Sequence, residues 1–551
     1  MNNRNFILLF ICFLPLLSFS QKPTWQWVSI DNNIDDSWGS SIVMDANSNI
    51  YATGSFRNTI TLDTFTFTSN GNYDVIITKY NALGQLKWAK GMGGHGDDAS
   101  NNSGGSVISV DATGNIYLSF PFSDTMVVDG QTFISKGGRD IALMKLDSNG
   151  NLIWGKSYGS VFNEYISKLL LKENNLYLCG MFSDAGTNSI QFDSITLITH
   201  GSWDIFLLKA DTMGHIFWAK NEGNTLSDMC GGITVDLNNN IYITGSTGGN
   251  LKLDHDTLWD VNAVGMNFVI KYDSTGNELW AKGALSTTGY YGGYIDADTN
   301  GNIYISGYTI NDQSINFGAL TLSSQGYNKT YLVKYSSSGQ LLFAKNISTY
   351  TFYDEAQCLR INPIENAIYL CGQYNYLATF GNDTLPSYGH DDILVLKMDE
   401  NGNVIWTTHA GGNINDGANG LAVAPNGDVA ITGYTASNNC QFGNHQVSAT
   451  DAWDMFVAKL SQTTGISNEP DQVKAEVYPN PANETIYLKS KDAIGAIKVY
   501  DITGKMVKEM KYETPTTNIS LDVRGLTDGM YFMEATAKGK VPLMEKMVIS
   551  H

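Results

Sequence analysis

The stretch Asn302-Ile303-Tyr304-Ile305-Ser306-Gly307 decides the fold, because its pattern recurs along most of the chain. An Asn-Ile-Tyr-x-x-Gly pattern, with conservative changes, returns in seven copies that begin at Asn49, Asn115, Asn175, Asn240, Asn302, Ala367 and Asp428. Successive copies are 66, 60, 65, 62, 65 and 61 residues apart. Self-similarity at a nearly fixed period indicates a repeat architecture, in which each unit packs on its neighbours.

Two other landmarks keep the same spacing. One is a short apolar strand that ends in an aromatic residue, at Trp88, Trp154, Trp218, Trp280, Phe343 and Trp406. The other is an apolar run typified by residues 204–209. Apolar and polar residues alternate with period two, and pairs such as Asn149-Gly150 provide turns. We therefore predict four strands per unit, with a small hairpin such as residues 192–197 inserted after the second strand.

Units of four strands at even spacing are typical of the blades of a β-propeller. The seventh unit ends at Leu460 without its Trp strand, whereas Trp27 lies one repeat step, 61 residues, before Trp88. We predict that the N-terminal strand completes the last blade, which removes two sheet edges that would otherwise be open to aggregation. The fold class is thus all-β, with a seven-bladed propeller over residues 21–460.

The repeats resemble a family of bacterial propeller proteins that carry Gly-Asn-Ile-Tyr and Trp-Ala-Lys signatures in units of roughly 60 residues. The resemblance covers about Thr24 to Leu460. It implies the propeller fold, but no particular reaction or ligand.

Beyond a polar linker at residues 461–473 the repeat stops, and residues 474–551 predict a small β-sandwich. This segment contains Tyr478-Pro479-Asn480-Pro481, a Tyr-Asp-x-x-Gly-Lys element at Tyr500, and a Leu-x-x-Gly-x-Tyr element ending at Tyr531. Together they resemble the type A sorting domain of the type IX secretion system of Bacteroidetes. The resemblance implies that the secretion machinery is the partner of residues 474–551, and that the cargo is released or attached to surface lipopolysaccharide. The alternative is an ordinary sandwich domain that binds the propeller.

Residues 1–20 predict a signal peptide, with Arg4 before an apolar run over residues 6–19 and a small-residue cleavage site ending at Ser20. The alternative, a membrane anchor, would need a longer apolar run. The signal peptide and the resemblance to a sorting domain predict a secreted or cell-surface protein. Because no other segment is long and apolar enough to span a membrane, we expect no transmembrane span in the mature protein.

Five cysteines follow the predicted signal peptide: Cys179, Cys230, Cys358, Cys371 and Cys440. An odd number in an exported protein leaves at least one cysteine unpaired or paired between chains. Cys358 and Cys371 flank one predicted hairpin and could face each other, but all five could equally be small buried apolar residues. The pairing stays open.

The net charge of the chain is −20, of which −19 belongs to the residues before Ile466. Such a field repels phosphate backbones, so nucleic acid is not expected as a partner. The chain has no phosphate-binding loop, no His-Glu-x-x-His and no Gly-x-Ser-x-Gly motif. We therefore assign no catalytic residue, no metal ligand and no cofactor.

Acidic residues fall ten positions after the strand-ending Trp in several units, at Asp98, Glu164, Asp228 and Asp416. These segments connect one blade to the next, near one mouth of the central channel. The carboxylates could form a ring that attracts a cationic ligand, or each could accept backbone N–H groups and fix its own connection. Recurrence in nearly every unit favours the second interpretation. His95 and Tyr290 depart from the repeat and are further candidates for ligand binding.

Regular repeats without catalytic motifs favour a binding or adhesion module for a glycan, a peptide or a protein, with the extracellular ligand unknown. The alternative is a polysaccharide-active hydrolase or lyase at the channel mouth, which would need two carboxylates at catalytic separation. Asp98, Glu164 and Asp228 would then be the first residues to mutate. A passive scaffold is a third option.

Overall fold

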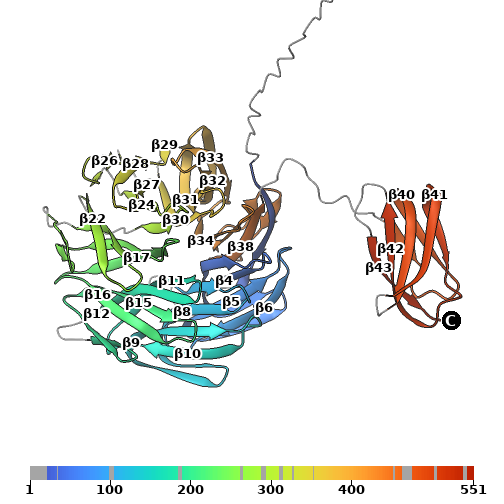
Figure 1. The fold of residues 1–551 in the computed structure, drawn as a ribbon, viewed down its shortest axis with the longest axis horizontal. Coiled ribbons are helices and arrows are strands. Elements are labelled where there is room, and N and C mark those ends of the chain that lie inside the picture. Colours follow the sequence, from blue (N-terminus) through green and yellow to red (C-terminus); the bar gives the residue numbers. More distant parts are fainter. Residues whose placement is uncertain are drawn as a thin grey trace, which may run out of the picture. The chain divides into compact units, whose positions relative to one another are not determined.

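The computed structural model describes residues 22–33, 35–98, 105–183, 189–260, 265–286, 293–309, 314–324, 328–350, 353–450, 453–461, 475–501, 505–537 and 543–551. All regular elements of these residues are β-strands. The chain forms two compact units, residues 1–462 and residues 463–551 (Figure 1). The predicted signal peptide lies outside the described residues.

Seven antiparallel sheets of the first unit each contain four main strands, and we call them blades 1 to 7. Blade 1 comprises β3 (Ser37–Met44), β4 (Ile50–Leu62), β5 (Phe65–Tyr80) and β6 (Leu86–Met92). Blade 2 comprises β7 (Val107–Val110), β8 (Ile116–Val128), β9 (Gln131–Leu146) and β10 (Leu152–Tyr158). Blade 3 comprises β11 (Glu164–Lys172), β12 (Asn175–Ser183), β15 (Trp203–Asp211) and β16 (Ile216–Glu222). Blade 4 comprises β17 (Asp228–Val235), β18 (Ile241–Thr247), β21 (Met266–Tyr272) and β22 (Glu278–Ser286).

Blade 5 comprises β23 (Tyr294–Ala297), β24 (Ile303–Thr309), β27 (Lys329–Tyr335) and β28 (Leu341–Asn346). Blade 6 comprises β30 (Tyr353–Ile361), β31 (Ile368–Phe380), β32 (Asp383–Met398) and β33 (Val404–Ala410). Blade 7 comprises β34 (Asp416–Val423), β35 (Val429–Thr435), β38 (Asp454–Ser461) and β1 (Thr24–Ile30). Short strands β2 (Asn32–Asn33) and β29 (Ser348–Tyr350) extend blades 1 and 6. The inserted hairpins are β13 (Ser189–Phe192) with β14 (Ile195–Ile198), β19 (Leu251–Lys252) with β20 (Thr257–Leu258), β25 (Ser314–Asn316) with β26 (Thr321–Ser323), and β36 (Cys440–Phe442) with β37 (His445–Val447).

Aspartates with a fixed local role form many of the turns. In the turn after β9, one carboxylate oxygen of Asp147 accepts the backbone N–H groups of Asn149 and Asn151, at 2.8 and 2.9 Å. The other oxygen accepts the side-chain amide of Asn151 at 2.9 Å, and Gly150 takes the left-handed conformation with φ +85°. The same bonds recur at Asp111, Asp236, Asp298 and Asp399. These acidic residues therefore build turns and leave few lone pairs for a ligand.

The Trp and Gly landmarks of the repeat meet between neighbouring blades. A Cβ added to Gly150 of blade 2 would lie 3.1 Å from the ring of Trp88 in blade 1, so the turn needs glycine for contact as well as for its positive φ. The indole N–H of Trp88 donates to the carbonyl of Ser148 in the same turn at 3.1 Å. The same contact joins Trp154 to Gly214 and Trp280 to Gly339. The repeat signature is thus an inter-blade contact.

The N-terminal strand completes blade 7, as predicted. Strand β1 pairs antiparallel with β38, with Trp27 opposite Lys459 and Ile30 opposite Phe456. Trp27 packs on Gly84 of blade 1 and donates its indole N–H to the carbonyl of Ala82, as Trp88 and Trp154 donate to turns of their neighbouring blades. The ring is closed because each pair of neighbouring blades, including blades 7 and 1, shares one buried apolar cluster. The propeller prediction is confirmed.

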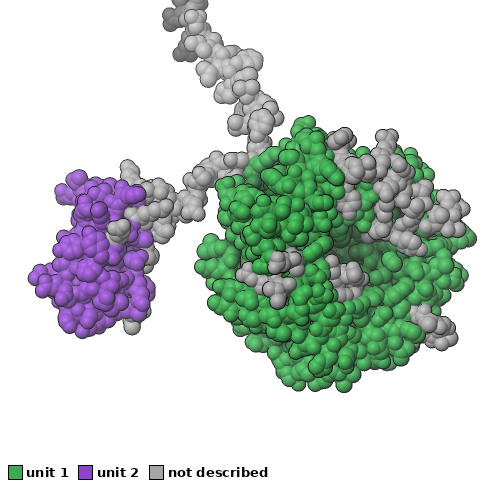
Figure 2. Space-filling view, turned by 180° about the vertical axis from the view of Figure 1, so that it is seen from behind, with its two compact units in different colours: residues 1–462 green, residues 463–551 purple. Residues whose placement is uncertain are grey.

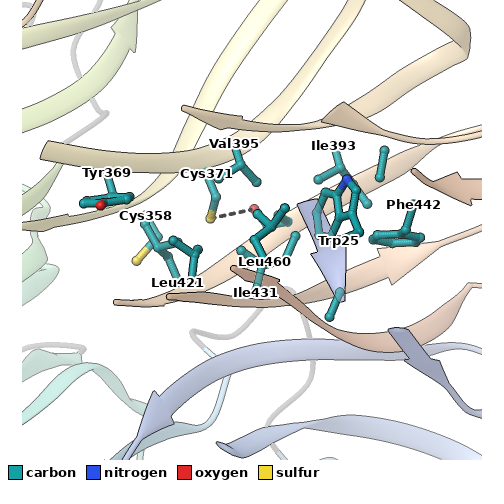
Figure 3. Close-up of a cluster of buried hydrophobic side chains, with 14 of the residues drawn as sticks. Trp25, Cys358, Tyr369, Cys371, Ile393, Val395, Leu421, Ile431, Phe442 and Leu460 are labelled. Atoms are coloured by element: carbon teal, nitrogen blue, oxygen red, sulfur yellow. Dashed lines mark hydrogen bonds between the residues drawn. The ribbon is translucent and has the colours of Figure 1, made fainter. Parts of the chain in front are cut away.

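The buried apolar cluster between blades 6 and 7 illustrates how neighbouring blades pack against each other. Trp25 of β1 packs edge-on against Phe442 with ring centroids 5.0 Å apart, beside Ile393 and Leu460 (Figure 3). Burying such side chains between flat sheets contributes about 1.5–3 kcal/mol for each large residue. The core of the propeller therefore lies between the blades.

The second unit contains β39 (Ala475–Tyr478), β40 (Thr485–Asp501), β41 (Met506–Asp522), β42 (Gly529–Ala537) and β43 (Leu543–Ile549). The first part of β40 pairs with β39, and its last part pairs with β42, with register shifts between Lys489 and Ala496. A strand that changes partners along its length serves both layers of a small sandwich. This unit has its own buried core, which includes Ile497, Tyr531 and Met547.

Candidate functional site

A β-bulge recurs in the innermost strands, which line the central channel. In five of these strands the pairing skips one residue, namely Ser40, Ser167, Gly231, Gln357 and Asn419. All five bulge residues line the same cavity of about 210 Å³. Because a bulge re-aims a side chain away from the regular pleat, each of these five blades presents one extra residue to the channel.

The channel contains two adjoining cavities of different character, and Figure 2 shows a hollow near the middle of this unit. The first holds the bulge residues together with Ser41 and Ser106, so hydroxyl and amide groups dominate its wall. The second, about 230 Å³, is lined mainly by apolar residues such as Met44, Ile108 and Leu171. Four residues line both cavities: Lys168, Ile233, Ile295 and Arg360.

Two cations face the channel from opposite parts of the ring. Lys168 belongs to β11 of blade 3, and Arg360 belongs to β30 of blade 6. Among the described residues, no carboxylate forms an ion pair with either side chain. Nη1 of Arg360 donates to the carbonyl of Leu359 at 2.9 Å, which leaves most of its donors for another partner.

The surroundings of Lys168 disfavour its charged form. Burial, followed by the positive charge of Arg360, lowers the pKa of Lys168 to about 8. The two cations are therefore close enough to repel each other, and an anion between them would relieve that repulsion. Lys168 stays predominantly protonated below pH 8.

Asp296 is the one carboxylate among the described residues that line the two cavities. Its Oδ1 accepts the hydroxyl of Thr234 at 3.0 Å and the N–H of Ala297 at 2.9 Å. Its Oδ2 accepts the N–H of Ile361 at 2.9 Å. Asp296 thus ties the inner strands of blades 4, 5 and 6 together, and its negative charge favours the charged forms of Lys168 and Arg360 without forming an ion pair with either.

Lys168 breaks the symmetry of the ring. The residues that follow the bulge in the five strands are Ser41, Lys168, Gly232, Cys358 and Gly420. A residue type that recurs at one position in all blades is explained by the repeated fold, whereas a charged residue found at that position in one blade is not. Sequence reasoning missed Lys168 and Arg360, and the available signal was this departure from the repeat inside the inner strands.

The predicted carboxylates lie at the blade junctions. Asp98, Glu164, Asp228 and Asp416 are completely buried. Each accepts the backbone N–H of the residue four positions earlier, at 2.7 Å from Gly94, 3.0 Å from Ser160, 2.7 Å from Asn224 and 2.7 Å from Gly412. These bonds match the interpretation in which each carboxylate fixes its own connection.

A second set of carboxylates lies on the third main strand of several blades. Asp74, Asp140, Asp204 and Asp392 are buried and also accept the N–H four positions earlier. Each lies close to a member of the first set. Burial, with a further contribution from the negative charge of Asp416, raises the pKa of Asp392 to about 8. Burial raises the pKa of Glu164 to about 8 as well.

Of the two candidate residues that depart from the repeat, the structure describes one. His95 is exposed in the connection between blades 1 and 2, and nearby Asp97 forms an ion pair with Arg139. Tyr290 lies outside the described residues. In the part of the chain that the structure describes, no group of three or more His, Cys, Asp or Glu side chains could hold a metal ion.

Two family models match parts of the chain. Residues 476–550 match the secretion system C-terminal sorting domain, and residues 223–252 match the β-propeller repeat. The described residues contain no helix that is long and apolar enough to cross a membrane.

Similarity to curated proteins is distant. The chain is 22% identical to a regulatory protein, FlaEY, of Caulobacter vibrioides over 78% of this chain and 47% of that protein. It is also 22% identical to an uncharacterised WD repeat-containing protein of Acanthamoeba polyphaga mimivirus, over 55% of this chain and 26% of that protein. The chain therefore spans less than half the length of either relative.

Solved structures with a similar arrangement include an acylaminoacyl peptidase of Pyrococcus horikoshii and Drosophila semaphorin 2a. The peptidase is 11% identical with a TM-score of 0.36, over 82% of this chain and 58% of that chain. The semaphorin is 7% identical with a TM-score of 0.35, over 97% of this chain and 99% of that chain.

Fold, repeat and C-terminal unit together define the class of protein. The chain is a β-propeller repeat protein that carries a type IX secretion sorting domain at residues 476–550. It is a secreted or cell-surface protein, and its sorting domain is handled by the type IX secretion machinery.

Proposed function

We propose that this protein is an extracellular binding module whose ligand enters the central channel and is held there by Lys168 and Arg360. The observation that carries the proposal is a pair of cations, without carboxylate partners among the described residues, in a channel of a strongly acidic propeller. Both side chains are partly buried, and holding two mutually repelling cations there without an ion-pair partner costs free energy, so the pair is better explained by a ligand than by stability.

The wall of the first cavity indicates the class of ligand. Ser40, Ser167, Gln357 and Asn419 offer hydroxyl and amide groups, and the cations offer hydrogen-bond donors for an anion. A volume of about 210 Å³ is smaller than the roughly 300 Å³ at which pockets begin to enclose drug-sized ligands. The site therefore suits one end group that bears both hydroxyls and a carboxylate, such as the terminal uronic acid of a glycan.

The alternative of a polysaccharide-active hydrolase or lyase has less support in the geometry. Asp98, Glu164 and Asp228 each belong to a different blade junction and are fully buried. The usual glycosidase mechanism needs two carboxyl groups that flank one bond. The described lining of the cavities contributes only Asp296 to such a pair.

The binding proposal can be tested by titrating the full chain with glucuronate, galacturonate and, as a neutral control, glucose, and following heat release. We expect the two acids to bind and glucose to bind at least tenfold more weakly. Arg360→Ala and Lys168→Ala should each weaken binding of the acids at least tenfold, because a charge-assisted hydrogen bond contributes about 1.5–3 kcal/mol.

Lys345→Ala is a matched control, because this lysine belongs to the outer strand β28 and does not line either cavity. It should bind the acids as the unaltered protein does. Equal affinity for glucose and glucuronate, or unchanged binding in both channel variants, would overturn the proposal.

A further inference from the structure

Two cysteines from different blades meet at the junction of blades 3 and 4. Sγ of Cys230, on β17, lies 2.7 Å from Sγ of Cys179, on β12. Both side chains are buried within the apolar cluster that joins these blades. The contact therefore connects two sheets that are otherwise held together by apolar packing and hydrogen bonds.

The other three cysteines are arranged differently. Cys358 and Cys371 are opposite each other in the pairing of β30 with β31, as their positions in the sequence suggest. The thiol of Cys371, however, donates to the carbonyl of Ala418 in blade 7, at 3.8 Å (Figure 3). Cys440 is buried on β36. Of the five thiols, the contact between sulfur atoms that the structure gives is that of Cys179 with Cys230.

We propose that Cys179 and Cys230 form a disulfide bond in the exported protein. The sorting domain marks this chain as a secreted or cell-surface protein, and disulfides form and persist in the oxidising cell envelope. The oxidant is a protein disulfide of the envelope. One cysteine thiolate attacks that disulfide and forms a mixed disulfide, and the second thiolate then displaces the oxidant as a dithiol. Two protons leave the cysteines, and the oxidant gains two electrons.

Burial sets the time at which this bond can form. Apolar surroundings, together with the neighbouring thiol of Cys230, raise the pKa of the Cys179 thiol well above its usual range. The reactive thiolate is therefore scarce once blades 3 and 4 have packed. The bond must form while the chain is still open, and the packed blades then shield it from soluble reductants.

The position of the bond complements the closure of the ring. The two cysteines are 51 residues apart in the sequence, so the bond closes a long loop of the unfolded chain. In a ring of seven blades, the junction of blades 3 and 4 lies opposite blade 7, where β1 pairs with β38. The propeller would thus be fastened at two opposite points, by a strand and by a covalent bond.

Peptide mapping of the exported full chain tests the proposal. Free thiols are trapped with iodoacetamide in denaturant without reductant, and the digest is analysed by mass spectrometry. We expect a linked peptide pair that contains Cys179 and Cys230, with Cys358, Cys371 and Cys440 alkylated. The three alkylated residues are internal controls for the trapping. Alkylation of both Cys179 and Cys230 in most molecules, or a bond between Cys358 and Cys371, would overturn the proposal.

A stability measurement gives a second, independent readout. Adding dithiothreitol should lower the urea midpoint of the exported protein by roughly 1 M, because the open chain regains conformational freedom. The midpoint of the Cys179→Ala/Cys230→Ala variant should not respond to the reductant, and that of Cys358→Ala/Cys371→Ala should respond fully. A reductant effect that persists without Cys179 and Cys230, or that is absent from the unaltered protein, would contradict the bond.

Discussion

The blade junctions and the central channel use charged residues in opposite ways. At the junctions, Asp98, Glu164, Asp228 and Asp416 recur around the ring, are buried, and accept backbone N–H groups at fixed positions. In the channel, Lys168 and Arg360 occur once each and have no carboxylate partner among the described residues. The comparison teaches that charge repeated in several blades maintains the fold, whereas charge that breaks the repeat is available for a ligand.

The largest effect is expected at a junction. In Asp416→Ala, the N–H of Gly412 and the hydroxyls of Thr435 and Ser437 lose their shared acceptor inside the protein. Leaving buried donors unsatisfied costs about 1–3 kcal/mol for each group, so we expect a loss of about 3 kcal/mol in the free energy of unfolding, measured by urea denaturation. Asp273→Ala, in an exposed turn, is the matched control and should cost about 1 kcal/mol. Similar losses of unfolding free energy in both variants would show that the junction carboxylate matters no more to stability than an exposed turn carboxylate.

A pH titration of stability sharpens the same comparison. Burial raises the pKa of Asp98 to about 7 and that of Glu164 to about 8, above the values near 4 expected for the unfolded chain. The folded state therefore binds more protons between about pH 4 and 8, and its stability falls as the pH rises through this interval, by at most about 1.4 kcal/mol per pH unit for each such carboxyl. The full contribution of these carboxyls to the free energy of unfolding is present below about pH 4.

Urea midpoints measured between about pH 4.5 and 9 check this prediction, and they should decrease up to about pH 8 and level off above it. Glu164→Gln removes one titrating group, so its pH profile should be flatter than that of the unaltered protein. A midpoint that increases over this interval would show that the junction carboxyls are ionised at little cost.

The smallest effect on stability is expected in the channel. Lys168→Ala removes a cation that Arg360 repels, so the free energy of unfolding should change by less than about 0.5 kcal/mol. Lys397→Ala is the contrasting variant, because this lysine pairs with Glu365 at 2.8 Å and lies over the ring of Tyr369. It should cost about 1 kcal/mol. Denaturation of the two variants under one set of conditions compares them, and a larger cost for Lys168→Ala would assign that lysine to the fold.

Much of the fold could be predicted because the repeat is visible in local sequence patterns. Period-two alternation and Asx-Gly turns indicate the strands, and the unpaired Trp27 indicates the strand that closes the ring. The candidate site could not be predicted in the same way. The junction carboxylates were visible as a regular spacing, whereas Lys168 looked like one more polar residue in a strand.

The sequence by itself determined the strands, their grouping into repeated units, the closing role of residues near Trp27 and the sorting domain at the C-terminus. All of these depend on neighbours in the chain or on a fixed spacing. Only the tertiary structure decided that Lys168 and Arg360 line the same channel and that Cys179 meets Cys230 between blades. These arrangements bring together residues that are far apart in the sequence, and a bulge of one residue in five inner strands, including β11 and β30, sets which side chains point inward.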